Sequence, residues 1–86
     1  MIEIKFEKEK NRSVALDGSK EVGVCEYIEK ENSWSIAHTI VNPEYRGQNI
    51  AKRLVESVLE EAKLNNKKVT ATCSYAIKLM KLKNNN

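Results

Sequence analysis

Apolar and polar residues alternate in the N-terminal third of the chain. Every second residue of Ile2–Phe6 is apolar, which is the two-residue period of a half-buried strand. Arg12–Leu16 predicts a second strand, and Asp17-Gly18 predicts the hairpin turn into a third strand, Glu21–Glu29. One face of this third strand is expected to carry Val22, Val24 and Ile28.

The alternation returns in Ser33–Val41, after a turn at Glu31-Asn32. One side of this strand is expected to carry Trp34, Ile36, His38 and Ile40, and the other side Ser35, Ala37, Thr39 and Val41. Pro43 should end the strand, because proline lacks the N–H that a sheet ladder needs.

The hydrophobic period then becomes helical. Residues 50–64 predict an amphipathic helix that ends at Asn65-Asn66. Its apolar face consists of Ile50, Ala51, Leu54, Val55, Val58, Leu59 and Ala62. The β-branched segment Lys68–Cys73 predicts another strand, after which Ser74 can cap a last short helix carrying Ala76, Leu79 and Met80.

A strand, a helix and a strand in this order form a βαβ unit, whose two strands normally lie parallel. The expected fold class is therefore α+β, an α/β sandwich with a mostly antiparallel sheet of about five strands and one βαβ crossover. Ligands of such sheets bind beyond the carboxyl ends of the parallel strands. The candidate site is thus the edge where residues 41–49 and 73–75 converge.

Composition narrows the class of protein. The chain has 86 residues, of which 31% are charged and 41% apolar, as in one soluble globular domain. We expect this domain to cover residues 1–83, with residues 84–86 frayed. The sequence shows neither a membrane-spanning apolar run nor a signal-type segment, so we expect a cytoplasmic protein without a membrane partner, a monomer or weak dimer. Cys25 and Cys73 are then expected to be reduced thiols.

Charge is distributed unevenly along the chain. Residues 1–45 hold six Lys/Arg against nine acids, a net charge of −3, whereas residues 46–86 hold nine against three, a net charge of +6. A basic half suggests an anionic partner. A nucleic acid is not expected, because the basic half has no Phe or Trp interleaved for base stacking.

The start of the predicted helix carries the strongest chemical signal. Arg46, Lys52 and Arg53 surround it with no acid between residues 45 and 55, although the helix dipole favours acids there. A bound phosphate or diphosphate would neutralise this charge. The alternative is that exposed cations are simply tolerated, partly by pairing with Glu56, at about 0.3–1 kcal/mol each.

The segment Val41-Asn42-Pro43-Glu44-Tyr45-Arg46-Gly47-Gln48-Asn49-Ile50-Ala51-Lys52-Arg53-Leu54 resembles motif A of the GNAT acetyltransferase superfamily. That motif is Arg or Gln, two residues, Gly, one residue, and Gly or Ala, and it follows a strand. Arg46 and Ala51 match, whereas Asn49 occupies the position of the family's glycine. Asparagine tolerates positive φ, so the turn can form, while its side chain is expected to weaken cofactor binding. His38-Thr39 and Cys73-Ser74-Tyr75-Ala76 extend the resemblance to a small GNAT-like subfamily.

The resemblance implies acetyl-coenzyme A as the cofactor. Backbone N–H groups of the motif A loop would hold its pyrophosphate, and the pantetheine arm would lie between two splayed parallel strands. The cofactor-binding residues expected on this basis are Ile40, Val41, Arg46, Gly47, Gln48, Asn49, Ile50, Ala51, Lys52 and Arg53.

Three side chains are candidates for catalysis. Cys73 could take the acetyl group covalently or be a small buried hydrophobe. Tyr75 could protonate the departing thiolate, as a tyrosine does in many GNAT enzymes, or only line the pocket. His38 could act as the base or lie in the core, and we expect the core position.

Two functions remain open. The first is an acetyl-coenzyme A-dependent acyltransferase of the N-acetyltransferase type, acting on an amine through a possible Cys73 relay. The second is a non-catalytic acetyl-coenzyme A-binding module, since full-length GNAT proteins have further strands that contribute to the acceptor-binding half.

Overall fold

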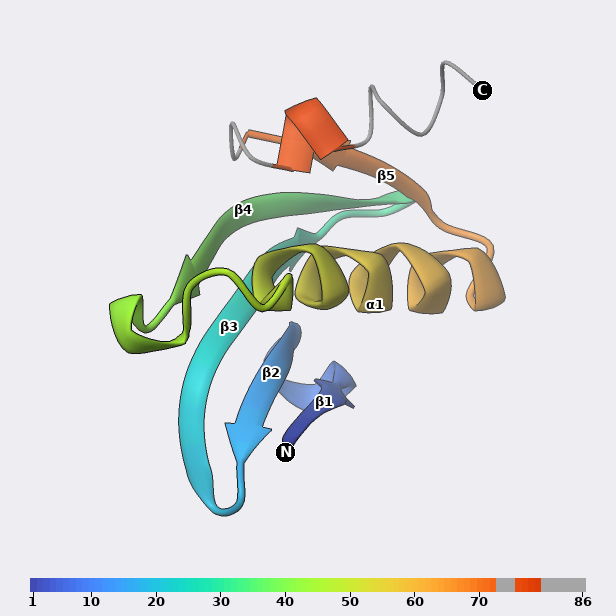
Figure 1. Ribbon diagram of the computed structural model, residues 1–86. Coiled ribbons are helices and arrows are strands. Elements are labelled where there is room, and N and C mark those ends of the chain that lie inside the picture. Colours follow the sequence, from blue (N-terminus) through green and yellow to red (C-terminus); the bar gives the residue numbers. More distant parts are fainter. Residues whose placement is uncertain (73–75, 80–86) are drawn as a thin grey trace.

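A five-stranded curved sheet with one long helix on its concave face forms the molecule (Figure 1). The computed structural model describes residues 1–72 and 76–79. The strands are β1 (Ile2–Glu7), β2 (Arg12–Asp17), β3 (Lys20–Glu29), β4 (Ser33–Val41) and β5 (Lys68–Ala71). The helices are α1 (Ile50–Leu64) and the 3-10 turns η1 (Lys8–Lys10) and η2 (Pro43–Tyr45), and residues 76–79 are also helical.

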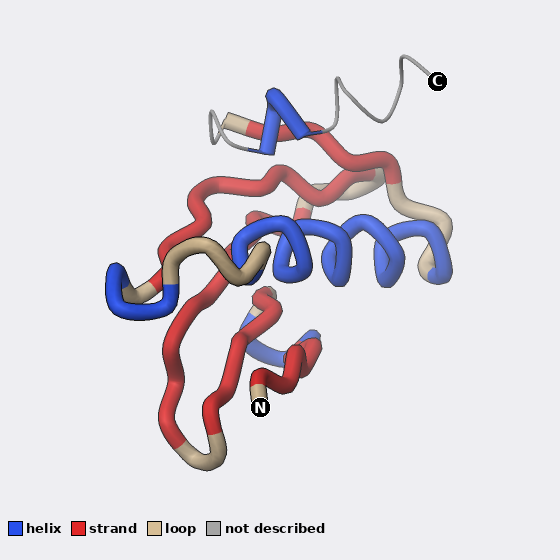
Figure 2. Tube along the Cα trace, viewed as in Figure 1, coloured by secondary structure: helices blue, strands red, loops and turns tan. Residues whose placement is uncertain are grey.

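Sheet order follows chain order, β1-β2-β3-β4-β5. The first four strands are antiparallel neighbours joined by short connections, and β5 lies parallel to β4 after the α1 crossover (Figure 2). The predicted fold class, the helix over residues 50–64 and the strand Ser33–Val41 are confirmed. The last predicted strand is observed over Lys68–Ala71, and its predicted end at Cys73 lies outside the described residues.

Helix α1 packs its apolar stripe on the sheet. Ile50, Leu54, Val55, Val58 and Ala62 are buried, as the helical period predicted. Close approach of helix and sheet depends on two small residues of the sheet. The buried Ser13 hydroxyl donates to the Leu54 carbonyl at 2.8 Å, and a Cβ on Gly23 would lie 3.2 Å from Leu54 Cδ1.

Three aromatic rings stack on one another in this core. Tyr27 and Trp34 stack with ring centroids 4.3 Å apart, and Phe6 stacks at 5.8 Å from Trp34. Trp34 and Ile36 are fully buried and pack in this core.

Two β-bulges change which side chains face α1. Val22 is an extra residue on β3 opposite Ala15 and Leu16, and Ala37 is an extra residue on β4 between the pairs Tyr27↔Ile36 and Glu26↔His38. A single inserted residue moves all following side chains to the other face. The predicted face assignments were therefore wrong in part: Ile28 is 56% exposed while Val22 is buried, and His38 and Ile40 do not share the core face of Trp34.

Strand β5 pairs with only the first part of β4. The register runs from Ser33↔Lys68 to Ile36↔Ala71, and the last bond is donated by Thr72 N–H to the Ile36 carbonyl at 2.9 Å. Residues 37–41 of β4 continue beyond this point, and the two strands separate toward the left of Figure 1. The Ala37 bulge thus lies where the parallel strands diverge.

Within residues 1–72 and 76–79, no helix is long and apolar enough to cross a membrane. The same part of the chain contains no group of three or more His, Cys, Asp or Glu residues arranged to hold a metal ion.

Candidate functional site

The candidate site begins at the edge of β4 that β5 leaves uncovered. Among the described residues, 37–41 have a strand neighbour on the β3 side only, since β5 pairing ends at Ile36. The N–H and C=O groups of an uncovered strand edge can bind an extended ligand as an added strand does. Ile40 is 59% exposed on this stretch, and Val41 is half-buried against the core.

A tight loop connects this edge to α1. Pro43 ends β4, as predicted, and the Asn42 side-chain oxygen accepts the Glu44 N–H at 3.0 Å to start η2. Gly47 has φ +84° and Asn49 has φ +58°, so both occupy the left-handed region. Asn49 adopts the turn conformation expected where the motif has glycine.

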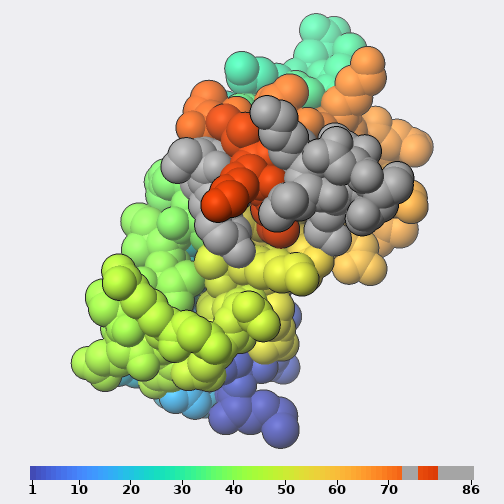
Figure 3. Space-filling model, turned by 45° about the horizontal axis from the view of Figure 1, so that its top comes forward, coloured from blue at the N-terminus to red at the C-terminus, as the bar shows by residue number. Residues whose placement is uncertain are grey.

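The loop borders an open cavity of about 220 Å³. Its lining residues are Val41, Tyr45, Arg46, Gly47, Asn49, Ile50 and Ala51. Figure 3 shows the yellow-green surface of residues 43–49 beside the yellow start of α1. The candidate positions 41 and 46–51 therefore lie together around one opening, with Gln48 exposed within the loop.

The first turn of α1 supplies N–H groups without competing acids. Asn49 makes no side-chain capping bond, and the turn contains no Asp or Glu. Arg46 and Lys52 are exposed near it. Ile50 is buried, so it can offer a ligand only its backbone. Such a helix start attracts an anion through free N–H groups and the helix dipole.

Arg53 is turned away from this opening. Its Nη2 donates to the Ile2 carbonyl at 3.4 Å, and it lines a separate cavity with Ile4 and Glu56. The structure does not bring Arg53 together with Arg46 and Gly47 around the loop cavity.

A hydrogen bond that the sequence alone does not predict anchors the loop between β4 and α1. Tyr45 Oη donates to Asp17 Oδ2 at 2.6 Å, the Met1 ammonium lies 3.7 Å from Asp17 Oδ1, and Lys20 Nζ lies 5.8 Å above the Tyr45 ring. The bond lowers the pKa of Asp17, and the Asp17 carboxylate raises the pKa of Tyr45. No local pattern signals this contact, because the two residues are far apart in the chain.

His38 lies on the sheet face opposite α1, half-exposed. The expectation of a core histidine is wrong, because the Ala37 bulge reverses the alternation after Ile36. His38 Nε2 lies 2.5 Å from Glu26 Oε1 of the neighbouring strand. A neutral imidazole that donates Nε2–H to this carboxylate carries its lone pair on Nδ1. No pattern in the sequence indicates a role for Glu26, because an unbroken alternation along β4 places its partner His38 on the core face of the sheet.

The two other catalytic candidates, Cys73 and Tyr75, lie outside the described residues. Cys25 is buried on the α1 side of β3, and its sulfur accepts the Thr39 hydroxyl at 3.4 Å.

Comparisons with known proteins agree with this architecture. A GCN5-like protein from Staphylococcus aureus is 30% identical, with 96% of this chain and 81% of that chain covered and a TM-score of 0.73. A ribosomal-protein-alanine N-acetyltransferase from Brucella melitensis biovar Abortus 2308 shares the fold at 19% identity and TM-score 0.66, covering 72% of this chain. An acetyltransferase of Clostridium acetobutylicum with acetyl-CoA shares it at 17% identity and TM-score 0.61, covering 81%.

The chain spans about half the length of the last two proteins, 48% and 53%. Among curated proteins, none matches it. The family described as GCN5-related N-acetyl-transferase matches residues 11–85, which include every strand from β2 onward, the loop and α1. The chain therefore belongs to the GCN5-related N-acetyltransferase (GNAT) family.

Proposed function

We propose that this protein transfers an acetyl group from acetyl-coenzyme A to an amine. The observation that carries the proposal is the continuity of two features: the edge of β4 at residues 37–41, which no described strand covers, leads directly into the acid-free N–H groups at the start of α1. The strand edge suits an extended chain that carries amides, and the helix start suits a diphosphate. Membership of the GNAT family and the acetyl-CoA in the C. acetobutylicum structure support this choice.

The cofactor-binding residues follow from this arrangement. Ile40 and Val41 would pair through their backbone with the pantetheine amides. The backbone of Gly47, Gln48, Asn49, Ile50 and Ala51 would hold the pyrophosphate, with Arg46 and Lys52 adding positive charge. Arg53, bound to the Ile2 carbonyl, would have to leave that contact to take part.

Acetyl-coenzyme A supplies an acetyl group activated as a thioester. The remaining task of the protein is to remove a proton from the attacking amine, because only a nitrogen with a free lone pair forms the new C–N bond. His38 Nδ1 is the proton acceptor in this proposal, and Glu26 fixes the ring through Nε2. As the C–N bond forms and the C–S bond breaks, the amine proton passes to His38 and Tyr75 protonates the departing thiolate.

A covalent relay is the second route that the proposal includes. The Cys73 thiolate would displace coenzyme A and form a thioester on its own sulfur, and the amine would then displace the Cys73 thiolate. Intact mass after incubation with acetyl-coenzyme A separates the routes. The relay requires a gain of one acetyl group that Cys73→Ala abolishes, whereas direct transfer requires product formation by that variant.

Binding is tested by calorimetry with coenzyme A at low ionic strength. Arg46→Glu reverses a charge at the loop cavity and should weaken binding by at least tenfold. Lys30→Glu makes the same change at an exposed position outside this cavity and should leave binding unaltered. Absence of any heat with the unmodified protein would refute the proposal.

Catalysis is tested with an amine panel and acetyl-coenzyme A. Product formation that His38→Ala lowers at least a hundredfold, without loss of coenzyme A affinity, supports the assigned base. Tight binding with no transfer to any amine would instead identify a non-catalytic acetyl-coenzyme A-binding module.

A further inference from the structure

The sheet face opposite α1 carries apolar side chains that are open to solvent. Val24 and Ile40 form a cross-strand pair on this face, since the neighbouring Gly23 faces Leu54 of α1. Ile40 is 59% exposed and Val24 is half-buried. Ile28 is also exposed on this face, on the far side of the Glu26–His38 pair. A chain this rich in charge therefore keeps an aliphatic surface next to its candidate base.

A cavity of about 380 Å³ lies over this pair. It is lined by Glu21, Val22, Gly23, Val24, Ile40, Asn42 and Pro43. Its volume falls in the range of small-molecule pockets, about 300–1,000 Å³. The side chains of Val24 and Ile40 thus form the apolar floor of this cavity, and Glu21 places a carboxylate at its border.

The cavity and the candidate base lie on one line along the sheet. The pair Glu26↔His38 follows the pair Val24↔Ile40 two residues along each strand, about 7 Å away on the same face. His38 is also two residues after Ile36, where β5 departs. A molecule lying on Val24 and Ile40 can therefore extend one end to His38, which lies near the point where β5 separates from β4.

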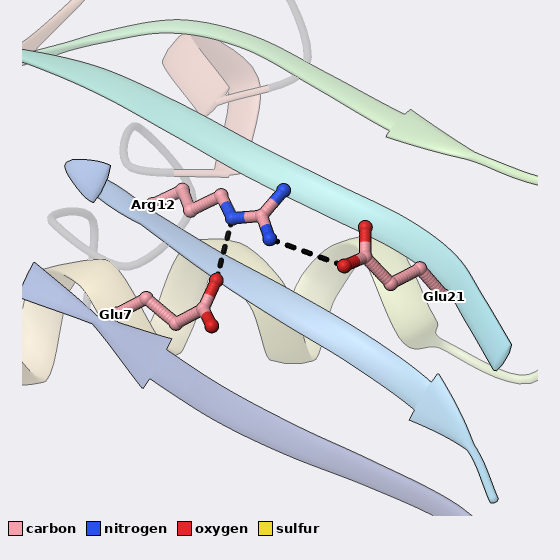
Figure 4. Close-up of polar contacts among 3 residues, drawn as sticks. All are labelled: Glu7, Arg12 and Glu21. Carbon is pink, nitrogen blue, oxygen red and sulfur yellow. Dashed lines mark hydrogen bonds and ion pairs between the residues drawn. The ribbon is translucent and has the colours of Figure 1, made fainter. Parts of the chain in front are cut away.

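Near His38 this face carries more carboxylates than cations, while Lys5 lies farther away on the same face, opposite Val14, which pairs with Val24. Arg12 is bound by Glu7 at 2.6 Å and by Glu21 at 3.2 Å, so two carboxylates surround one guanidinium (Figure 4). Figure 4 shows these residues on β1, β2 and β3 with α1 behind the sheet. Glu26 adds a further carboxylate beside His38. An amine would be attracted here, and a carboxylate-bearing molecule would be repelled.

We propose that the acceptor is a small aliphatic primary amine whose hydrocarbon body lies on Val24 and Ile40 and whose amino group reaches His38 and Glu26. This inference rests on the proposed acetyl transfer and assigns its acceptor class. The amine binds on the face opposite α1, and the acetyl donor binds along residues 37–41 of β4. The C–N bond forms between them, the C–S bond of the donor breaks, and the amine proton passes to His38 Nδ1.

A homologous series of n-alkylamines, from methylamine to hexylamine, tests the apolar floor. If the hydrocarbon body is bound, kcat/KM rises about two- to fourfold per methylene as the chain lengthens from propyl to hexyl. Amino acids that carry a carboxylate beside the amine are poorer acceptors. A flat series, or a preference for lysine-containing peptides over every free amine, overturns the assignment.

Val24→Ser is the decisive variant, and Ile28→Ser is its matched control. Val24→Ser should raise the KM for hexylamine by about tenfold more than the KM for methylamine, and coenzyme A affinity should not change. Ile28→Ser removes an exposed aliphatic residue from the same face outside the cavity and should change neither. Equal effects of the two variants would overturn the proposal.

Amine binding is also measured without turnover, by amide chemical shifts during a hexylamine titration of the coenzyme A-loaded protein. Shifts are expected at Val24, Glu26, His38 and Ile40. If coenzyme A binds but hexylamine shifts none of these amides, the acceptor inference is wrong and the donor site stands. If coenzyme A itself fails to bind, the proposed function fails.

Discussion

The bond between Tyr45 and Asp17 joins the candidate loop to the β2–β3 hairpin. Because it lowers the pKa of Asp17, the carboxylate contributes stability above its unfolded pKa near 3.8, and this contribution is lost as the pH falls through the lower folded value. Tyr45→Phe removes the donor, so the pKa of Asp17 should rise toward its ordinary value. A side-chain carboxyl NMR titration measures this. An unchanged Asp17 pKa would mean that Tyr45 does not hold the carboxylate.

Asn49 provides the second prediction at this scale. Asn49→Gly keeps the left-handed turn and removes the side chain that borders the loop cavity, so coenzyme A should bind more tightly, by about two- to tenfold. Asn66→Gly is the matched control, because Asn66 has φ +56° at the other end of α1. The control should change stability by less than about 1 kcal/mol and leave affinity unaltered. Calorimetry compares the two variants, and equal or weaker affinity for Asn49→Gly would contradict the argument.

These residues also show which features of single residues can be predicted from the sequence and which cannot. The positive φ of Asn49 follows from a local motif and the known tolerance of asparagine, so it could be predicted. The contacts of Tyr45 with Asp17 and of Glu26 with His38 join separate strands and loops, and they depend on register. One sequence alone contains no signal for them.

Strand β3 and helix α1 approach closely at Gly23. A Cβ at this position would lie 3.2 Å from the Ile40 carbonyl oxygen and 3.2 Å from Leu54 Cδ1. Gly23→Ala should therefore lower the free energy of unfolding by about 1–3 kcal/mol in urea titrations. Leu54→Ala removes one of the two obstructing groups, so the double variant should be more stable than the sum of the single effects. Additive losses would show that Leu54 does not limit the fit.

Most element boundaries and the buried face of α1 were readable from the sequence, but the faces of β3 and β4 were not. The two-residue period located β4, and the helical period located α1 from Ile50 to Leu64. The bulge at Ala37 breaks that period without any glycine or proline beside it, whereas Gly23 directly follows the bulge at Val22. Because each bulge reverses the alternation, the exposed His38 was assigned to the core.

At the scale of the whole molecule, Tyr27 makes stability depend on alkaline pH. Burial raises the pKa of Tyr27 to about 12, whereas the unfolded value is 10.0. Above pH 10 the unfolded chain ionises first, so the contribution of Tyr27 to stability is present below pH 10 and is lost as the pH rises toward 12. Urea unfolding at about pH 8 and about pH 11 should show a smaller alkaline loss for Tyr27→Phe than for the unmodified protein.

The substitution suits this comparison because the described residues provide no hydrogen-bond partner for the Tyr27 hydroxyl. Removing that hydroxyl should therefore leave stability at neutral pH nearly unchanged or slightly higher. A parallel pH dependence of the two proteins would show that Tyr27 ionises equally in both states.

The fold class of the whole molecule could be predicted because each element carries its own periodicity and the βαβ order dictates a parallel pair. The aliphatic face above Val24 and Ile40 could not, since it appears only after the bulges have set the orientation of both strands. Long-range geometry, rather than composition, creates that surface.

The stacked rings have a practical consequence. Trp34 is the chain's single tryptophan and is fully buried, and the centroid of its ring lies 4.3 Å from that of Tyr27. Its intrinsic fluorescence therefore reports on the interior alone: emission should shift to longer wavelength when water reaches the indole. Stopped-flow mixing with denaturant can follow this signal in the unlabelled protein, so folding rates of all variants become measurable without an added dye.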